Sequence, residues 1–367
     1  MIFTLDPESL MRILVINSGS ATLKYRVFDA AAGRLVQLSG GTAGVADGYR
    51  PAVERVVAGA GELPHAIAHR VVHGGDHPAD VALIDDALLR ELHTLGSLAP
   101  LHNGPALEGI EATRGLGVPL IAAFDTAFHR TLPGHARRYA LPDGLDVRRY
   151  GFHGWSHRYV AERYAELARS PNPTIITLHL GSGCSAAAIE RGCSVDTSMG
   201  YSPLEGLVME TRPGDLDPGI LLHLLRQGVT PDRLEQMLNH ESGLLALAGT
   251  RDMRELLSRS DPAARLAVEI FCYRIRKYVG AYLAVLDGAE AIVFTGGIGE
   301  NAPEIRRRVC RGFGWAGLEV DPERNARGDG RISTGDSRLA AFAIPTDEER
   351  LIAQEAVSLL RSATGSS

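Results

Sequence analysis

Residues 13–29 read ILVINSGSATLKYRVFD. The apolar run ILVI ends at Asn17, small residues follow, and a second alternating stretch begins with a single lysine, Lys24. This order predicts a strand, a tight bend and a second strand that pairs as a hairpin. A lysine just past a bend can reach back over it and meet a phosphate group as a point charge. A lysine that only decorates an edge strand is the simpler alternative.

The same order recurs in residues 174–191, TIITLHLGSGCSAAAIER. Neither bend leads directly into a helix, and the chain contains no GxxxxGKS or GxxxxGKT loop and no GxGxxG that opens a βαβ unit. The repeat predicts two similar halves whose hairpin bends hold phosphate through backbone N–H groups and hydroxyls. The alternative for each segment, taken alone, is an ordinary tight hairpin.

Length and composition limit the classes of protein to consider. The 367 residues suggest two domains at roughly 150 residues each. A net charge of −6 and a pI near 6.1 give no electrostatic reason to expect nucleic acid or a membrane surface as a partner. The four cysteines contain no CxxC pair, which favours a reducing cytosol. The N-terminus lacks the pattern of a signal peptide, and charges interrupt the long apolar stretch 262–287. We therefore expect a cytoplasmic protein.

Strand-like and helix-like segments alternate along the chain, which predicts an α/β fold. The predicted strands include residues 67–73, 118–126, 174–180, 185–192 and 291–297 besides the opening hairpin. The predicted helices are residues 85–99, 156–170, 220–228, 232–240, 262–287 and 351–362. Many of the 41 glycines cluster in GGTAG, HGG, GSG and TGGIGEN, and these clusters predict loops that bend sharply or approach a ligand closely.

Several polar stretches contain candidates for chemistry. TRPGDLDPG, residues 211–219, is too polar and too rigid for a core. Its Arg212, and Arg70 in AHRVVHGG, could each clamp two oxygens of a carboxylate or phosphate, although a surface ion pair is the simpler reading of any one arginine. HLGSGCS, residues 179–185, offers backbone amides without obstruction by Cβ atoms. FTGGIGEN, residues 294–301, predicts a strand, a glycine turn and then a helix from about Asn301, with Asn301 or its neighbour as the cap.

The residue types favour Mg²⁺ over zinc as a candidate metal. The histidines that recur every fourth residue from 65 to 77 lie in a β-branched segment that predicts a strand, and no soft-ligand cluster favours zinc. Carboxylate and amide oxygens suit Mg²⁺, which keeps several waters and binds phosphates. Asn17, Asp125 and the pair Glu348 and Glu349 qualify by type.

Taken together, these stretches resemble the acetate kinase family of acetate and propionate kinases. The resemblance runs in order along almost the whole chain, through VINSGSATLKY, AHRVVHGG, LAPLHNGPA, FDTAFHRTLP, YGFHGWSH, HLGSGCS, DTSMGYSPLEGL, TRPGDLDPG, FTGGIGEN and IPTDEER. It implies an α/β fold of two duplicated actin-like or hexokinase-like (ribonuclease H-like) domains with an ATP cleft between them. Residues 1–129, completed by the helix 350–367, would form the N-terminal domain. Residues 130–349 would form the C-terminal domain, which carries most of the nucleotide site.

The resemblance also implies roles for particular residues. Asp125, His153 and Arg212 match catalytic positions, and Asn17 and Glu348 match positions linked to Mg²⁺ or, in its place, Mn²⁺. Arg70 matches the residue that meets the substrate carboxylate. The pocket for the acyl methyl group would be formed by Val72, Leu101, Phe152 and Pro203. The nucleotide positions would be Lys24, His179, Leu180, Gly181, Ser182, Gly183, Asp252, Met253, Arg254, Gly297, Ile298, Gly299, Glu300 and Asn301. A homodimer is implied as well.

The chain departs from the family pattern at a few positions. Ser182 stands where asparagine is usual, Cys184 where serine is common and Trp155 where threonine is usual. HNGPA replaces HNPPN, and Glu210 precedes Thr211 where glycine is expected. These changes leave the nucleotide preference and the choice between acetate and propionate open.

The implied reaction is the reversible transfer of the ATP γ-phosphoryl group to acetate, which yields acetyl phosphate and ADP. A carboxylate with a pKa of about 4 is already ionised at neutral pH, so it needs no general base. We therefore expect Asp125 to orient an arginine, a metal-bound water or the substrate. Two other activities are weighed against this one: a phosphatase of the same superfamily, and a non-catalytic, filament-forming relative of actin that binds ATP.

Overall fold

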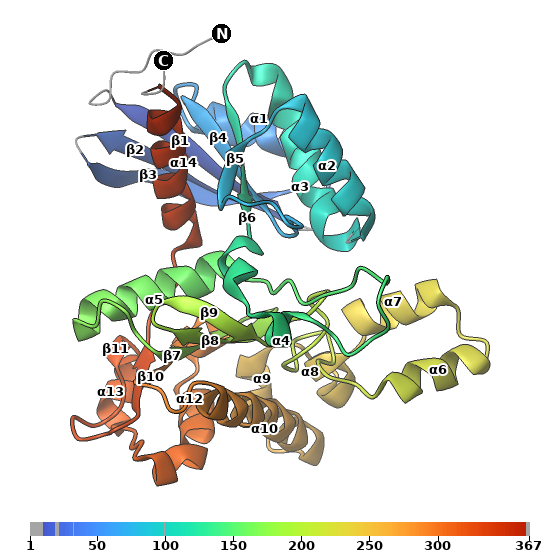
Figure 1. The fold of residues 1–367 in the computed structure, drawn as a ribbon, viewed down its shortest axis with the longest axis vertical. Coiled ribbons are helices and arrows are strands. Elements are labelled where there is room, and N and C mark those ends of the chain that lie inside the picture. The colour runs from blue at the N-terminus through green and yellow to red at the C-terminus, as the bar shows by residue number, and fades with distance from the viewer. Residues whose placement is uncertain (1–9, 19–21, 32, 99, 365–367) are drawn as a thin grey trace. The chain divides into compact units, whose positions relative to one another are not determined.

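The computed structural model describes residues 10–18, 22–31, 33–98 and 100–364, and divides the chain into two compact units (Figure 1). Unit 1 comprises Met1–Phe128 and Asp347–Ser367, and unit 2 comprises His129–Thr346. Each unit contains one mixed sheet of six strands with helices packed on it. The predicted α/β fold of two similar actin-like domains is therefore confirmed.

Unit 1 begins with β1 (Met11–Ser18), whose alternate side chains face opposite sides of the sheet. Leu14 and Ile16 share a core with α1 and α2 residues, while α14 (Glu348–Thr364), red in Figure 1, also packs against β1. The other elements of this unit are β2 (Thr22–Ala31), β3 (Arg34–Gly44), α1 (Tyr49–Gly59), β4 (Ala66–Val71), β5 (Val81–Leu83), α2 (Asp86–Leu98), α3 (Pro100–Thr113), a 3₁₀ turn (Arg114–Leu116) and β6 (Leu120–Phe124). A second 3₁₀ turn, Ala127–Thr131, leads into unit 2.

Unit 2 places α5 (Gly154–Ala168) and the long α10 (Pro262–Val285) against its sheet. Its strands are β7 (Ile175–Leu180), β8 (Cys184–Glu190), β9 (Cys193–Thr197), β10 (Ala291–Thr295), β11 (Gly330–Arg331) and β12 (Ala340–Ala343). Its other helices are α4 (Gly134–Arg137), α6 (Pro218–Arg226), α7 (Pro231–His240), α8 (Gly243–Ala248), α9 (Met253–Ser258), α11 (Gly296–Asn301), α12 (Pro303–Cys310), a 3₁₀ turn (Arg311–Ala316) and α13 (Pro322–Arg327). Within the described residues, none of the helices combines the length and apolar character needed to span a bilayer.

The two sheets repeat one topology. The strand order is β3-β2-β1-β4-β6-β5 in unit 1 and β9-β8-β7-β10-β12-β11 in unit 2, read in the same direction. In both, the first two strands form the predicted antiparallel hairpin, and the first strand pairs in parallel with the fourth. Even the irregularity between the second and third strands recurs, between Val27 and Phe28 and between Ala188 and Ile189. The prediction of two similar halves is confirmed.

The shared register assigns equivalent positions at the ends of the strands. Ile13 pairs with Ala66 and Ile175 with Ala291, so Asn17 and His179 occupy the same place in their strands. Across each hairpin, Asn17 pairs with Lys24, and His179 pairs with Ser185. The carboxyl end of the central strand therefore carries predicted site residues in both units.

One prediction about glycine clusters is wrong and another is right in part. GGTAG lies in β3 instead of a loop, where an added Cβ on Gly40 would stand 3.0 Å from Cγ of Arg26 on the paired strand. The predicted helix after TGGIGEN is confirmed, because α12 begins at Pro303 with Ala302, the neighbour of Asn301, at its N-cap position. The glycine segment before it is not an open turn, because Gly296–Asn301 already form α11. Asn301 caps neither helix through its side chain and donates instead to the carbonyl of Gly297, 3.0 Å away.

The strand-to-helix turn at Gly296 requires glycine. Its φ is +76°, and an added Cβ would lie 2.8 Å from the carbonyl oxygen of Leu180 on β7. The neighbouring Gly297 has no such restriction, since its added Cβ would meet no atom within 4 Å. The two adjacent glycines therefore tolerate side chains differently.

We predict that Gly296→Ala lowers the free energy of unfolding by at least about 1–2 kcal/mol, because the left-handed backbone alone costs an L-residue that much. Gly297→Ala is the matched control and should change stability by well under 1 kcal/mol or raise it slightly. Urea unfolding followed by circular dichroism measures both. Equal midpoints for the two variants would contradict the assigned turn geometry.

Candidate functional site

In unit 1, Arg70 and Asp125 form a two-point ion pair at the ends of neighbouring parallel strands. Arg70 lies near the end of β4 and Asp125 directly follows β6, and the two strands pair through Val71 and Phe124. Nε of Arg70 lies 3.1 Å from Oδ1 of Asp125, and Nη2 lies 2.5 Å from Oδ2. The Asp125 side chain is only 1% exposed. A guanidinium held at two points by a buried carboxylate keeps one orientation.

Asn17 and Glu348 approach the same guanidinium. Nη1 of Arg70 donates to Oδ1 of Asn17 at 3.3 Å, and Nε lies 3.6 Å from Oε2 of Glu348. Burial lowers the pKa of Arg70, but the charges of Asp125 and Glu348 outweigh this, so its pKa lies above the ordinary value. The structure thus brings four predicted residues of unit 1 together.

Glu348 is a buried carboxyl group that is not fully compensated. Burial raises its pKa to about 7, with repulsion from Asp125 acting in the same direction and the charges of Arg70 and Lys24 acting against it. Lys24 itself is exposed on β2. The oxygens of Asn17, Asp125 and Glu348 around one arginine fit a small divalent cation, which prefers oxygen ligands and would favour the ionised carboxylate. Among the described residues, no group of three or more His, Cys, Asp or Glu side chains is arranged to hold a metal.

Asn103 fixes the chain just after Arg70. This fully buried residue of α3 accepts a hydrogen bond from the backbone N–H of His73 and donates one to its carbonyl, both at 2.9 Å. The backbone N–H of Gly74 donates to Oγ1 of Thr126 at 3.2 Å. Val72, a predicted acyl-pocket residue, is half-buried beside this turn. Leu101, another, belongs to α3, and its side chain lies outside the described residues.

In unit 2, His153, Gly183 and Arg212 meet at one point. An added Cβ on Gly183 would stand 2.7 Å from Nη2 of Arg212 and 3.1 Å from both Cε1 and Nε2 of His153. His153 directly precedes α5 and holds a left-handed backbone with φ of +56°. Such a conformation is uncommon for a residue other than glycine and often occurs at functional sites. A guanidinium and an imidazole therefore converge on Gly183, where any larger residue would crowd them.

The ring of His153 is held on two sides. Its Nδ1 lies 2.8 Å from Oγ of Ser185, and the ring stacks on His179 with centroids 4.2 Å apart. His179 in turn lies 2.7 Å through Nδ1 from Oγ of Ser156. The backbone before His153 is anchored too, because the carbonyl of Phe152 lies 3.0 Å from Nε2 of His129. These contacts limit how far the imidazole can turn.

Arg212 is a half-buried cation with little local compensation. Among the contacts that the structure describes, its acceptor is the carbonyl oxygen of Pro203, 2.8 Å from Nη1, and no carboxylate pairs with it. Burial lowers the pKa of Arg212, while Cys184 and Glu210 act in the opposite direction. A desolvated guanidinium of this kind gains strongly from an oxyanion ligand.

The loop that carries Arg212 is tied to the rest of unit 2 by Asp215. Oδ1 of Asp215 accepts from the backbone N–H of Gly206 at 2.8 Å, and the hydroxyl of Tyr278 donates to both carboxylate oxygens at 3.0 Å. Arg274 lies 3.1 Å from Oδ2. The other acid of the motif, Asp217, caps α6. Asp215 is therefore an anchor for the loop.

Two positions that depart from the family pattern are neighbours in space. The backbone N–H of Glu210 donates to the carbonyl of Ser182 at 3.3 Å. Ser182 itself is exposed, whereas Cys184 is buried and its thiol donates to the carbonyl of Gly181 at 3.2 Å. Ser182 and Cys184 thus lie at the turn that also contains Gly183, and Glu210 contacts this turn from another segment.

The glycine turns at 181–183 and 296–297 lie beside each other. An added Cβ on Gly181 would stand 3.6 Å from Nε2 of His179 and 3.9 Å from the backbone nitrogen of Gly297. Oε1 of Glu300 braces the second turn by accepting from the backbone N–H groups of Gly296 and Thr346, at 3.0 and 3.1 Å. The two turns thus form one neighbourhood. It contains the predicted nucleotide residues of both segments, including Leu180 and Ile298 to Asn301.

The third predicted nucleotide segment, residues 252–254, stands at the start of α9. Asp252 caps α9, and its carboxylate pairs with Arg254 at 2.8 Å. Arg254 is 91% exposed, and Met253 between them is buried. Among the contacts that the structure describes, none joins this pair directly to Gly181 or Gly297.

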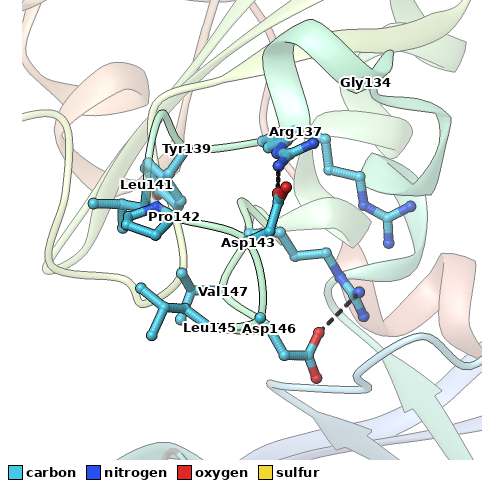
Figure 2. Close-up of a pocket in the computed structure, with 12 residues that line it drawn as sticks. Gly134, Arg137, Tyr139, Leu141, Pro142, Asp143, Leu145, Asp146 and Val147 are labelled. Carbon is cyan, nitrogen blue, oxygen red and sulfur yellow. Dashed lines mark ion pairs between the residues drawn. The ribbon is translucent and has the colours of Figure 1, made fainter.

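A cavity elsewhere in unit 2 does not coincide with any predicted site residue. It has a volume of about 380 Å³ and is formed by residues 134, 137–139 and 141–148 (Figure 2). Figure 2 shows Leu141, Pro142, Leu145 and Val147 as its apolar side chains. Asp143 and Asp146 form ion pairs with Arg138 and Arg148 there. Nothing in this arrangement offers the convergent charges found around His153 and Arg212.

Several residues that shape the site were not predicted. Arg306 is 1% exposed and donates through Nη1 to the carbonyls of Gly299 and Glu300, both at 2.7 Å, which fixes the end of α11. His129, Asn103 and Asp215 similarly hold backbone beside predicted residues. Asn103 and His129 belong to stretches that resemble the family, but an arginine in a charged helix gives no sequence signal of burial.

Comparisons with known proteins identify the family to which the chain is similar. A model of the acetokinase family matches residues 52–354. The acetate kinase of Solibacter usitatus is 54% identical over 311 residues, which cover 80% of this chain and 75% of that protein.

Two solved structures extend the match to the fold. A propionate kinase from Francisella tularensis has a TM-score of 0.84 at 36% identity, covering 94% of this chain and 98% of that one. The acetate kinase of Porphyromonas gingivalis has a TM-score of 0.85 at 35% identity, covering 95% of this chain and 100% of that one. On these grounds the chain belongs to the acetokinase family.

Proposed function

We propose that this chain transfers the γ-phosphoryl group of ATP to acetate and forms acetyl phosphate and ADP reversibly. The observation that carries this proposal is the convergence of His153 and Arg212 on Gly183. Phosphoryl transfer requires positive charge and hydrogen-bond donors around the oxygens of the transferring group. Arg212 is half-buried and has no carboxylate partner among the described contacts, so a phosphoryl oxygen would supply the missing negative charge.

The nucleophile needs no proton removed, because acetate is ionised at neutral pH. Asp125 would therefore orient Arg70, which it holds at two points. Arg70 would receive the carboxylate of the substrate. The main barrier is the approach of an anion to a polyanion, and preorganised positive groups lower it.

Asn17 and Glu348 would hold Mg²⁺, or Mn²⁺ in its place, together with water and the phosphates of ATP. When bound, such an ion supplies charge neutralisation for the phosphoryl oxygens. Lys24 would act on the phosphates as a point charge. The glycine turns at 181–183 and 297–301, with residues 252–254, would contact the nucleotide, so unit 2 would carry most of the nucleotide contacts.

The acyl group would contact Val72, Leu101, Phe152 and Pro203. Phe152 and Pro203 are buried and Val72 is half-buried. One methylene changes discrimination in such a pocket by only about 1–3 kcal/mol. Propionate is therefore the alternative acceptor, and the relatives include both an acetate kinase and a propionate kinase.

A hydroxamate assay tests the proposal directly, because hydroxylamine traps acyl phosphates. Purified full-length protein is given ATP or GTP, Mg²⁺ and one of acetate, propionate or butyrate. We expect trapped product that depends on both the carboxylate and the nucleotide. Hydrolysis of ATP without added carboxylate would indicate the phosphatase alternative, and ATP binding without any acyl phosphate would indicate the actin-like alternative.

We predict that Arg212→Ala lowers kcat by about 10²–10³, because one preorganised charge donor is typically worth that much. The KM for ATP should change only a few-fold. Arg233→Ala is the control, since Arg233 forms an exposed ion pair with Glu241 at 2.7 Å. An unchanged kcat for Arg212→Ala would remove this residue from the mechanism.

The pairing of Arg70 with Asp125 can be tested by a double-mutant cycle. If Asp125 acts through Arg70, Asp125→Asn and Arg70→Gln should each reduce kcat/KM for acetate by about 10-fold or more, and the double variant should lose little beyond the larger single loss. Arg12→Gln and Asp29→Asn form the control cycle, because that ion pair of 2.8 Å lies between β1 and β2 of the same unit. Fully additive losses for Arg70 and Asp125 would show that they act independently.

We further propose a cytoplasmic homodimer. The described cysteines are all free thiols, which suits a reducing compartment. α6 has no buried residue, although several of its side chains are large and apolar. Ile220, Leu222 and Leu225 are 41–52% exposed. A second copy of the chain would cover this apolar helix.

We predict that the double substitution Leu222→Glu and Leu225→Glu converts the dimer to a monomer, because charges would replace apolar contacts in the interface. Light scattering coupled to size-exclusion chromatography measures the mass. Leu167→Glu on α5, where the leucine is 49% exposed, serves as the control. A double variant that keeps the mass of a dimer would place the interface elsewhere.

A further inference from the structure

Four side chains of unit 2 form a continuous hydrogen-bonded chain that ends at His153. Oγ1 of Thr177 on β7 lies 2.7 Å from Nδ1 of His157 on α5. Nε2 of His157 lies 2.7 Å from Oγ of Ser185 on β8, and this same oxygen lies 2.8 Å from Nδ1 of His153. Thr177, His157 and Ser185 are fully buried. Solvent therefore offers these groups no alternative partners.

His157 is neutral in this chain, so only one of its ring nitrogens has a proton. Burial lowers the pKa of His157 well below the ordinary value, and His129 and His179 act in the same direction. A neutral imidazole donates through one nitrogen and accepts through the other. The Ser185 hydroxyl lies between two rings, so it accepts from one ring and donates to the other.

These requirements allow two directions for the chain, and only one satisfies every proton. If Thr177 donates to Nδ1 of His157, Nε2–H donates to Ser185, and the Ser185 hydroxyl donates to Nδ1 of His153. In the opposite direction Thr177 accepts from His157, and its own hydroxyl proton needs another acceptor. Among the described contacts, His157 is the partner of the Thr177 hydroxyl and no backbone carbonyl accepts from it. A buried hydroxyl without an acceptor is costly.

We propose that Thr177, His157 and Ser185 are positioning residues that hold His153 in the tautomer with its proton on Nε2. The Nε2 edge of the ring faces Gly183, beside Arg212. This inference rests on the proposed phosphoryl transfer, for which Nε2–H would donate a hydrogen bond to an oxygen of the transferring group. No proton transfer is involved, because the imidazole serves as a donor throughout. The opposite tautomer would direct a lone pair at that oxygen.

The experiment reads the tautomer first, independently of activity. The full-length protein is labelled with ¹⁵N at histidine, and His153→Gln assigns the His153 ring signals. We expect a protonated Nε2 and an unprotonated Nδ1 that accepts a hydrogen bond. Thr177→Val keeps the shape but removes the hydroxyl, so His153 should become a mixture of tautomers, whereas Thr177→Ser should keep the original pattern.

The kinetic measurement then follows the same pair of variants. Thr177→Val should lower kcat about 3- to 10-fold, as expected for the loss of one hydrogen bond, with the KM for ATP within about twofold. Thr177→Ser should restore kcat to near the original value. Since Thr177 is two side chains away from His153, loss of packing alone would not change the His153 signals.

Two results would overturn the inference. One is a proton on Nδ1 of His153 in the unaltered protein, and the other is identical His153 signals in the valine and serine variants. Failure of the proposed function would look different, because a chain without acyl phosphate formation could still show the predicted tautomer and its dependence on Thr177.

Discussion

The antiparallel pairing of β7 with β8 determines the geometry on which the site of unit 2 depends. It sets His179 opposite Ser185 and leaves the turn at Gly181–Gly183 just beyond them. The ring of His153 then packs on His179 and contacts Ser185, because α5 begins where these strands end. Unit 1 uses the same pairing, with Asn17 opposite Lys24. One backbone arrangement thus places polar groups at a strand end twice, and different side chains give the two ends different chemistry.

Three buried or partly buried arginines show how differently a positive charge can be accommodated. Arg70 is paired with carboxylates, which raise its pKa despite burial. Arg306 donates to backbone carbonyls and to Asn325 and serves the structure alone. Arg212 has one carbonyl partner, Pro203, and its pKa is lowered by burial. Desolvating a cation without an anion is costly, and that cost is recovered only when a negatively charged ligand arrives.

The charges around Arg70 in unit 1 differ from those around Arg212 in unit 2. Around Arg70, the acids Asp125 and Glu348 outnumber the guanidinium. The pKa of Glu348 is raised mainly by burial, and repulsion from Asp125 acts in the same direction. Around Arg212, the described contacts include no carboxylate pair, and the guanidinium donates to the carbonyl of Pro203. The strand topology is the same in both units, but the charged side chains at the strand ends differ.

Much of the fold and part of the candidate site could be predicted from the sequence. The alternating hairpins and the β–α order are local patterns, and local patterns are readable because strand and helix periods are imposed by the backbone. The roles expected of Arg70, Asp125, His153 and Arg212 were implied by the resemblance to the family. Glycine clusters predicted loops less well, since GGTAG forms part of β3 and GGIGEN forms α11. Glycine permits a bend without requiring one. α1 and α3 were not predicted, and α3 even contains Pro105.

The amino-acid pattern alone predicts two similar α/β halves and shows which motifs carry the charged side chains. The folded structure adds that Asp125 holds Arg70, that no carboxylate among the described contacts pairs with Arg212, that Arg306 is buried, and that Thr177 reaches His153 through two intervening side chains. The physical reason is that these contacts join residues far apart in the chain. Their hydrogen-bond partners and their desolvation are set by packing, which no local pattern encodes.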